Sequence, residues 1–261
     1  MHNGDMSEHL AKIHRYPVKG LSAQELESAD LTPGQGLAMD RRFAITHGAT
    51  TFDVNAPVWR PKSNFLTLVR TERLAALQTE FDADTATLTV RRGPRVVARG
   101  RIDTPIGRSL IDQFLAAFLS GHVLGVPRLV EAPGTMFTDR EEKLVAVINL
   151  ASLGDLERRV VRQPVDCRRF RANLLLDGFP PWVENNWVGK VLAIGNARLA
   201  IVEPIERCAV TNINPTTGTC DLNIPQALHR GFGHARFGVY ARVITGGTVA
   251  VGNTAAIVAP N

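Results

Sequence analysis

The first hundred residues alternate between apolar and polar side chains over short stretches that turn residues separate. Such a period of two predicts β-strands that are buried on one face. Residues 41–46 show the pattern, and in that register Phe43 and Ile45 face a core while Arg42 lies on the opposite face. The same pattern predicts strands over residues 12–16, 64–69, 86–91 and 95–102. Short strands at this spacing favour a barrel or sandwich over a parallel sheet.

One segment has helical spacing instead. Thr104 is a candidate N-cap, Pro105 follows it in the first turn, and Gly121 lies where the apolar pattern stops. Between them the apolar residues recur every three or four positions: Leu110, Ile111, Phe114, Leu115, Phe118 and Leu119. We predict a helix that packs this stripe against the sheet and takes no part in catalysis.

After residue 130 the pattern changes. Residues 131–143 are polar and charged and contain Pro and Gly, so we predict a linker or mobile loop and divide the chain into domains 1–130 and 131–261. Short helices are expected after residue 150, where Ser152 and Asp155 have capping-box spacing, and at residues 225–229. Strands are predicted at residues 144–148, 198–205 and 246–252. The predicted fold class is mainly β with a few helices (α+β).

Composition narrows the classes of function. The 261-residue chain has a net charge of +5 and globular proportions of apolar and charged residues, so wholesale disorder is excluded. The basic residues are scattered and form no block interleaved with aromatics, which argues against a nucleic-acid partner. We find no signal peptide and no membrane-length apolar run. We therefore expect a soluble, cytoplasmic protein with no membrane partner, and a positive charge that suits a small anionic ligand.

The three cysteines are Cys167, Cys208 and Cys220, an odd number that argues against a disulfide framework. Cys208 follows the apolar run that ends at Ile205 and comes directly after Arg207. A cation beside a thiol favours the thiolate, which is the form that binds soft metals or attacks electrophiles. Cys208 is therefore the leading candidate for chemistry, although a cysteine in such a position is more often an inert buried thiol.

Two other roles for Cys208 follow from its neighbours in the sequence. Cys208 and Cys220 precede His229 and His234 in an order typical of zinc sites, but the two cysteines are too far apart for a structural zinc pair. A cysteine nucleophile that carries persulfide sulfur is the second alternative, and Cys167 would serve that role as well as Cys208. A non-catalytic binding module is the third.

Several motifs, taken together in order, resemble one family. Tyr16-Pro17-Val18-Lys19-Gly20 and Asp40-Arg41-Arg42-Phe43 resemble a MOSC N-terminal β-barrel domain. A second set of motifs resembles the MOSC domain itself: Phe170-Arg171-Ala172-Asn173, Glu184 with Trp187, Arg207-Cys208, Asn214-Pro215 with Gly218, and Phe237-Gly238. This domain is the C-terminal module of molybdenum-cofactor sulfurases and of the mitochondrial amidoxime-reducing component. The resemblance implies an N-terminal β-barrel-like domain packed on a MOSC β-barrel.

The resemblance also implies a molybdenum cofactor, a pterin whose dithiolene sulfurs bind the metal. Cys208 matches the metal ligand, and Arg207 stands beside it. The positions that match cofactor contacts are Lys19, Arg42, Arg171 and Asn173; if the last two lie on one strand, they point to the same face. Glu206 is a candidate proton donor in catalysis, and the competing interpretation is that it forms a salt bridge with a nearby arginine.

The implied function is a molybdenum-cofactor oxidoreductase that removes oxygen from N-hydroxylated or related small-molecule substrates. Three cysteines cannot supply the four ligands of an iron–sulfur cluster, so its electrons are expected from a separate ferredoxin- or cytochrome-type protein. The alternatives are a persulfide carrier and a non-catalytic cofactor-binding protein. Two departures from the family pattern stand out: Gly20 replaces a hydroxyl residue, and the usual anion-contacting segment is not recognisable in residues 51–57, where Arg60 or Lys62 could substitute for it.

Overall fold

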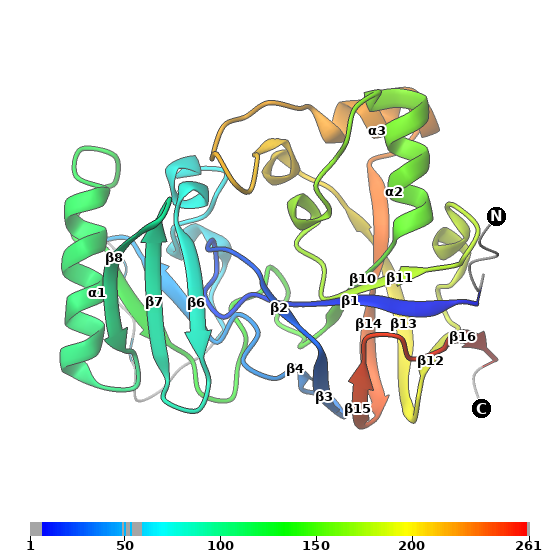
Figure 1. The fold of residues 1–261 in the computed structure, drawn as a ribbon, viewed down its shortest axis with the longest axis horizontal. Helices are drawn as coiled ribbons and strands as arrows, with labels where there is room; N and C mark the ends of the chain where they lie inside the picture. Colours follow the sequence, from blue (N-terminus) through cyan, green and yellow to red (C-terminus); the bar gives the residue numbers. More distant parts are fainter. Residues whose placement is uncertain (1–6, 49, 51–52, 54–58, 260–261) are drawn as a thin grey trace.

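The computed structural model describes residues 7–48, 50, 53 and 59–259, and shows two lobes side by side (Figure 1). Residues 51–57, where the family's anion-contacting segment was not recognisable, lie outside the described residues except for Asp53. The strands are β1 (His9–Arg15), β2 (Gln24–Leu26), β3 (Ser28–Thr32), β4 (Gly36–Leu37), β5 (Phe43–Thr46), β6 (Gln78–Asp82), β7 (Thr87–Arg92), β8 (Arg95–Arg101), β9 (Arg128–Glu131), β10 (Val145–Asn149), β11 (Leu174–Asp177), β12 (Val191–Ile194), β13 (Ala197–Glu206), β14 (Arg236–Thr245), β15 (Gly247–Ala250) and β16 (Ala255–Val258).

Helices are few among the described residues. The α-helices are α1 (Pro105–Phe118), α2 (Leu150–Leu156) and α3 (Ile224–Phe232). The shorter turns are η1 (Lys62–Asn64), η2 (Glu72–Ala76), the π-helical η3 (Glu157–Val161), η4 (Cys167–Phe170), η5 (Val183–Asn186) and η6 (Ala209–Asn212). The predicted class, mainly β with a few helices, is confirmed.

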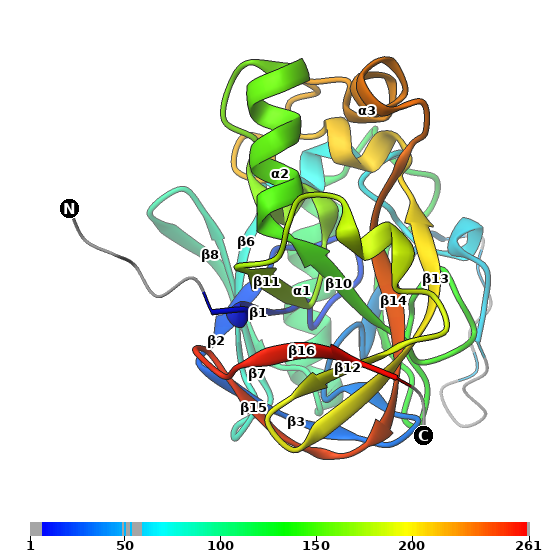
Figure 2. The same cartoon turned by 90° about the vertical axis from the view of Figure 1, so that its right-hand side faces the viewer.

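The larger lobe is built on a curled, eight-stranded sheet. Its strand order is β16-β12-β13-β14-β10-β11-β1-β2, and only the β10–β11 pair is parallel. The sheet wraps around a core whose members alternate along β13 and β14, the period expected when one face of a strand is buried (Figure 2). On the other face, α2 and α3 cover a second cluster that includes Phe170 and Phe237.

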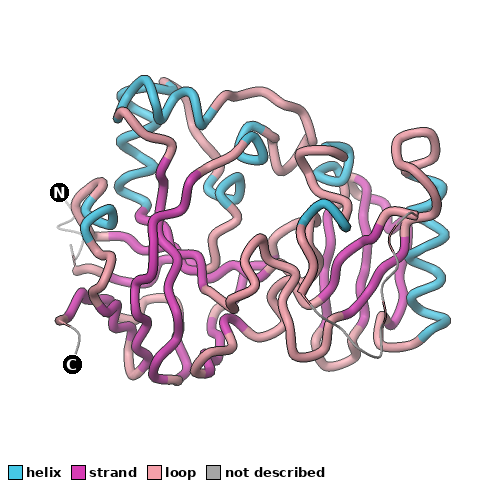
Figure 3. Tube along the Cα trace, turned by 180° about the vertical axis from the view of Figure 1, so that it is seen from behind, coloured by secondary structure: helices cyan, strands magenta, loops and turns pink. Residues whose placement is uncertain are grey.

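The smaller lobe holds the three-stranded sheet β6-β7-β8 and the pair β5-β9, with α1 packed on its outer side (Figure 1). All four residues of β5 are buried, with Phe43 and Ile45 in the main core of this lobe as predicted. The space between the two lobes is filled largely by loops and single-turn helices rather than by a continuous sheet (Figure 3). Side chains from both lobes therefore meet there on loops, where functional residues are commonly found.

Helix α1 begins where the sequence predicted. The Thr104 hydroxyl accepts a hydrogen bond from the Gly107 amide at 3.2 Å, Pro105 starts the helix, and Gly121 takes a positive φ of 74° just beyond it. The predicted stripe is right for Ile111, Leu115 and Leu119, which are buried. It is wrong for Leu110, which is 49% exposed because it lies at the edge of the contact with the sheet.

One predicted strand and one predicted helix cap are wrong. Residues 64–69 do not form a strand: Phe65 makes one isolated bridge to Thr46, and the chain then turns with the Arg70 amide bonded to the Thr67 carbonyl at 3.1 Å. Ser152 does not cap α2. Asn149 does so instead, since its side chain accepts from the Ala151 amide at 3.0 Å, and the buried Ser152 hydroxyl accepts from the Trp182 amide.

Two strands from the first half of the chain pair with strands from the second half. Strand β1 lies between β11 and β2, and β3 pairs with β15. These pairings cross the boundary predicted at residue 130, which stays a prediction. No α-helix among the described residues has the length and apolarity needed to span a bilayer.

Candidate functional site

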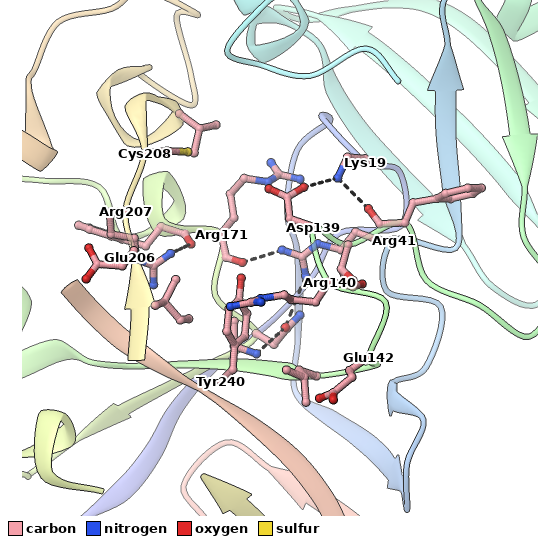
Figure 4. Close-up of a pocket in the computed structure, with 18 residues that line it drawn as sticks. Lys19, Arg41, Asp139, Arg140, Glu142, Arg171, Glu206, Arg207, Cys208 and Tyr240 are labelled. Carbon is pink, nitrogen blue, oxygen red and sulfur yellow. Dashed lines mark hydrogen bonds and ion pairs between the residues drawn. The ribbon is translucent and has the colours of Figure 1, made fainter. Parts of the chain in front are cut away.

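A charged cavity of about 150 Å³ lies between the two lobes (Figure 4). Its walls come from the turn after β1, the residues before β5, the loop between β9 and β10, the segment before β11 and the end of β13. The polar residues that line it are Lys19, Arg41, Thr138, Asp139, Arg140, Glu142, Arg171, Asn173, Glu206, Arg207, Cys208 and Tyr240. Domain seams are a usual place for a ligand, because two elements can offer groups to it from opposite sides.

Cys208 stands at the mouth of this cavity. Strand β13 ends at Glu206, and Cys208 begins η6 with an extended backbone, while its carbonyl accepts hydrogen bonds from the amide and hydroxyl of Thr211 at 3.1 and 2.9 Å. The residue is exposed and its thiol is free. Cys208 also lines a second, larger cavity next to the first. The thiol is therefore open to a ligand from two directions.

Arg207 is held by aromatic rings and backbone carbonyls. Its guanidinium lies 5.3 Å from the Phe170 ring centroid and 5.9 Å from that of Phe237, two rings stacked at 4.1 Å. Nε donates to the Phe237 carbonyl at 2.8 Å and Nη1 to the Phe170 carbonyl at 2.7 Å. Gly238 has a φ of 76° and leaves the space, since a Cβ there would lie 2.4 Å from the Val147 carbonyl and 3.3 Å from Nη2 of Arg207.

The remaining nitrogen of Arg207, Nη2, is buried and has no partner among the described residues. Burial lowers the pKa of the Arg207 guanidinium to about 10. The group still carries its positive charge at neutral pH. Arg207 thus has a buried donor without an acceptor and a positive charge without an ion-pair partner among the described residues.

Arg171 has the same character. It follows η4 in the left-handed region with a φ of 51°, and its Nη1 donates to the Leu21 carbonyl at 2.8 Å. Its Nη2 is buried without a partner. Burial, followed by the nearby charge of Arg41, lowers the pKa of Arg171 to about 10. Two guanidinium groups of the cavity therefore each offer a buried, unused donor.

Arg41 and Arg171 both contact the ring of Tyr16. Their guanidinium carbons lie 4.4 and 4.3 Å from its centroid. Arg41 also pairs with the buried Asp40 and donates to the Arg171 carbonyl at 2.7 Å. Burial raises the pKa of Tyr16 to about 12 against the opposing effect of the two cations, so the ring stays neutral.

Lys19 approaches the cavity from the smaller lobe. Its Nζ donates to the Phe137 carbonyl at 2.9 Å and to an oxygen of Asp139 at 2.7 Å (Figure 4). Burial lowers the pKa of Lys19, and the attraction of Asp139 offsets only part of that. Burial alone would raise the pKa of Asp139, but Lys19 and then Lys62 outweigh it and hold this pKa below its ordinary value. Asp139 is thus an anion placed among cations.

The structure brings together all but one of the residues that the sequence proposed for the site. Arg42 lies outside the cavity: its Nε donates to Glu131 at 3.0 Å, and it lines a separate surface hollow. The reason is local, because Arg41 takes a left-handed φ of 45° just before β5, and the β5–β9 pairing then sets Arg42 beside Glu131. Arg41 occupies the place proposed for Arg42.

Asn173 lines the cavity, but not on a strand shared with Arg171 as expected, since β11 begins only at Leu174. Its amide oxygen accepts from the Ala146 amide at 3.1 Å, and its nitrogen donates to the His14 carbonyl at 3.1 Å. Both ends of the side chain thereby fasten β1 and β10. Asn173 supports the wall of the cavity and keeps little hydrogen-bonding capacity for a ligand.

Glu206 also lines the cavity, with an exposed side chain. It makes no ion pair with any described residue, so the salt bridge with an arginine is not present there. In Figure 4 its carboxylate lies on the side of Arg207 away from Lys19. The carboxylate is therefore open to solvent and has no ion-pair partner among the described residues.

The other cysteines and histidines do not join Cys208. The described residues contain no group of three or more His, Cys, Asp or Glu side chains placed to hold a metal ion, so the Cys208–Cys220–His229–His234 set is not assembled. Burial, and next the charge of Asp166, raises the pKa of Cys167. Its thiol is half-buried, whereas Cys208 is exposed, so Cys208 is the more accessible of the two proposed nucleophiles.

Sequence reasoning missed Tyr16, Arg41 and Asp139 as parts of the site. The first two lie inside motifs that the family resemblance used, and the consecutive arginines at 41 and 42 carried no sign of which one turns inward. Asp139 lies in a stretch that reads as a polar linker. A positive φ at Arg41 is the deciding feature, and no residue pattern reports it directly.

The composition of the cavity fits an anionic group with a soft metal. A buried donor without an acceptor costs about 1–3 kcal/mol, and the free Nη2 atoms of Arg171 and Arg207 would each lose that cost on meeting an anionic oxygen. The exposed thiol of Cys208 supplies the soft sulfur donor in the same cavity. These three side chains would hold the group.

These observations define a mainly β protein with a cationic, thiol-bearing cavity between its two lobes. The chain matches the MOSC N-terminal beta barrel domain over residues 7–109 and the MOSC domain over residues 132–256. It belongs to the family of proteins that join these two domains, which confirms the resemblance seen in the motifs.

Named relatives share parts of the chain. Molybdenum cofactor sulfurase of Caenorhabditis elegans is 25% identical over 244 residues, 89% of this chain and 33% of the relative. Mitochondrial amidoxime-reducing component 1 of Mus musculus is 37% identical over 79 residues, 30% of this chain and 22% of the relative. The YuaD protein of Bacillus subtilis, a solved structure, has a TM-score of 0.47 at 10% identity and covers 98% of this chain and 97% of its own. This chain spans about a third of the length of the sulfurases it matches.

Proposed function

We propose that the chain binds a molybdenum cofactor in the cavity at the domain seam and acts as an oxidoreductase on N-hydroxylated or related N-oxygenated small molecules. One observation carries the proposal: two buried guanidinium groups with unused donors and one exposed thiol line the same cavity. Such a set matches a ligand that is anionic at one end and binds sulfur at the other. The name of the sulfurase relatives mentions the cofactor, and the name of the amidoxime-reducing relatives mentions the substrate class.

Each residue has a distinct part in this proposal. Arg171 and Arg207 donate to anionic oxygens of the cofactor, with Arg41 and Lys19 adding positive charge at longer range. Cys208 provides the soft sulfur ligand to the metal. When bound, the cofactor supplies the change of redox state and the exchange of oxygen. The protein supplies orientation, charge and protons.

Removing the hydroxyl oxygen of an N-hydroxylated compound as water consumes two electrons and two protons. Glu206 is the candidate for delivering protons, because its carboxylate lines the cavity, is exposed, and has no ion-pair partner among the described residues. The electrons would come from a separate ferredoxin- or cytochrome-type protein. Proton delivery at Glu206 predicts that Glu206→Gln slows turnover while the bound metal content stays unchanged.

Metal analysis tests the proposal directly. Protein purified from a host that makes the cofactor should contain about one molybdenum per chain, Cys208→Ala should lose most of it, and Cys220→Ala should keep it. Cys220 is the matched control, since it is also an exposed free cysteine but does not line the cavity. Zinc in place of molybdenum, or equal loss in both variants, would contradict the assignment.

A sulfur carrier is the second candidate function. The relatives that cover most of this chain are sulfurases, and the exposed Cys208 thiol could bear a persulfide. Mass spectrometry of the purified chain decides between the two. A mass gain of one sulfur atom on Cys208, in protein that holds no molybdenum, would favour the carrier. Molybdenum without sulfur and without turnover would indicate a non-catalytic cofactor-binding protein.

A further inference from the structure

The second cavity lies against the first and is larger, with a volume of about 600 Å³. One wall comes from residues 61–70 of the smaller lobe, and the other from Cys208, Ala209 and Val210 at the start of η6. A volume of this size lies within the range of about 300–1,000 Å³ that holds a drug-sized molecule. The first cavity has about 150 Å³. The two therefore suit different occupants.

The walls of the second cavity are largely apolar. Leu68 is buried and Pro61 and Val69 are exposed, and they face Val210 across the opening. Val69 is 52% exposed, which leaves apolar surface in water. Covering such surface with an apolar ligand is favourable, at about 25 cal/mol per Å² buried. The cavity thus favours a ligand with an apolar body.

The charges around the second cavity are mostly positive. Lys62 and Arg70 are exposed at its edge, and Arg70 makes no ion pair with a described residue. Asp139 is the one acidic side chain in the lining, and it lies 2.7 Å from Lys19 and 3.4 Å from Lys62, so two cations already neutralise it. A cationic ligand would meet net repulsion here, and an anionic one net attraction.

Cys208 forms part of the boundary between the cavities, as do Lys19, Asp139, Arg171 and Val210. A molecule that fills the second cavity would therefore contact the thiol. A cofactor held by Arg171 and Arg207 in the first cavity would reach the same thiol from the other side. The two occupants would meet at Cys208.

We propose that the second cavity is the substrate pocket and that it selects uncharged or anionic N-hydroxylated compounds with an apolar, ring-sized body over cationic ones. This inference rests on the proposed function for the reaction, but the selection itself follows from the walls and charges. Each methylene buried against the pocket should strengthen binding about fourfold. A ring should therefore strengthen it by at least about tenfold.

Binding measurements on the cofactor-loaded chain test the selection. The probes are acetamidoxime, benzamidoxime, and benzamidoxime carrying a 4-carboxylate or a 4-trimethylammonium group. Calorimetry should give an affinity at least about tenfold higher for benzamidoxime than for acetamidoxime, and the carboxylate should bind several-fold more tightly than the ammonium probe. Equal affinities for the two uncharged probes, or tighter binding of the ammonium probe, would overturn the proposal.

Val69→Asp places a negative charge on the apolar wall at a position exposed enough to accept it. It should weaken the carboxylate probe by about fivefold or more and reverse the order of the charged probes. Val96→Asp is the matched control, because Val96 is 50% exposed and lies on β8, outside both cavities. Circular dichroism checks that both variants fold. An unchanged order in Val69→Asp would refute the pocket.

Turnover of the same probes separates the two proposals. If the chain reduces them and Val69→Asp changes kcat/KM in the order of binding, both proposals hold. If the chain reduces them but Val69→Asp leaves the order unchanged, the pocket is wrong and the reductase function stands. If nothing is reduced while binding follows the expected order, the pocket stands and the reductase function fails.

Discussion

Tyr16 places two like charges next to each other at the domain seam. The guanidinium carbons of Arg41 and Arg171 both lie within 4.4 Å of the centroid of its ring. A guanidinium over an aromatic face is worth about 0.5–2 kcal/mol, which offsets part of the repulsion between the two cations. The ring thereby holds both arginines in the cavity. Tyr16 is a positioning residue, since its own hydroxyl is buried and without a partner among the described residues.

Replacing Tyr16 tests this role. We expect Tyr16→Leu to lose most of the affinity of the cavity for inorganic phosphate, because Arg41 and Arg171 move apart when the ring is removed. Tyr16→Phe keeps the ring and should retain that affinity, with stability within about 1 kcal/mol of wild type. Calorimetry at low salt measures both. Equal affinity in the Leu and Phe variants would show that the ring does not position the arginines.

Glu184 is a second residue whose environment predicts a measurable effect. It is 1% exposed, its Oε2 accepts a hydrogen bond from the side-chain amide of Asn149 at 3.2 Å, and its Oε1 is buried without a partner among the described residues. Burial raises the pKa of Glu184 above its ordinary value. As pH falls, the carboxylate of Glu184 is therefore protonated at a higher pH in the folded protein than in the unfolded chain. The stability that this protonation contributes is present at low pH and is lost as pH rises through the folded pKa.

Glu184→Gln removes that pH dependence. At pH 7.5 the variant should be more stable than wild type by about 1 kcal/mol, because it no longer buries a charge with an unused oxygen. The difference should shrink as pH falls towards 4.5. Urea unfolding at several pH values measures it, and other titrating groups cancel in the comparison. A difference that stays constant between pH 7.5 and 4.5 would rule out Glu184 as its source.

At the scale of elements, the loop between β9 and β10 (residues 132–144) is the least expected part of the site. It was predicted as a linker, yet ion pairs fix it to both lobes: Asp139 to Lys19 at 2.7 Å, Arg140 to Glu203 at 2.5 Å and Glu142 to Arg242 at 3.0 Å. All three of these loop residues line the charged cavity. The loop thus forms a wall of the site and sets its charge.

Removing the Asp139 charge should strengthen anion binding. Asp139→Asn leaves Lys19 free to meet an anion, so we expect about fivefold tighter binding of inorganic phosphate. Because the pKa of Asp139 is held below its ordinary value, the advantage should persist from pH 7 down to about pH 5, where wild-type Asp139 is still ionised. Glu80→Gln, which removes an exposed ion-paired acid far from the cavity, should have no effect. Unchanged affinity in Asp139→Asn would contradict this.

Elements with a clear hydrophobic period could be predicted, and the others could not. Strand β7 and helix α1 lie close to their predicted places because their buried residues repeat at the period of the element. Strands β5 and β8 also lie close to their predicted places, although all of β5 is buried and no residue of β8 is fully buried. Residues 64–69 failed because Leu66 and Leu68 are buried by successive turns that happen to alternate with polar residues. Strand β6 was missed because Phe81 is its one buried residue, so it has no period to detect.

The site followed the same division. Cys208 with Arg207, and Arg171, could be proposed from residue types and motif order, and these three line one cavity. Choosing Arg41 over Arg42 depends on a backbone conformation, and placing Asp139 beside Lys19 depends on a contact across 120 residues of sequence. Contacts of that range are set by tertiary packing, which residue patterns do not encode locally.

At the scale of the whole molecule, the amino-terminal strands β1 and β3 pair with strands from the second half of the chain. Leu10 and Ile13 of β1 pack in the same core as Leu174 and Leu176 of β11, and β1 pairs with β11 directly. Strand β3 likewise pairs with β15 at the other end of the chain. Lys19, which follows β1, and Asn173, which precedes β11, both line the cavity. The site therefore depends on residues from both ends of the chain being folded together.

This arrangement predicts how the chain responds to being cut at residue 130. Residues 131–261 alone would leave β11 and β15 as unpaired edges and expose Leu174 and Leu176, so we expect a fragment without a cooperative thermal transition and with poor amide dispersion in NMR spectra. The intact chain should unfold in one transition. Adding residues 1–130 to the fragment should restore dispersion if both halves are needed for the sheet. A fragment that folds cooperatively on its own would show that β1 and β3 are additions to a complete domain. Anion binding by that fragment would further place the site within residues 131–261 alone.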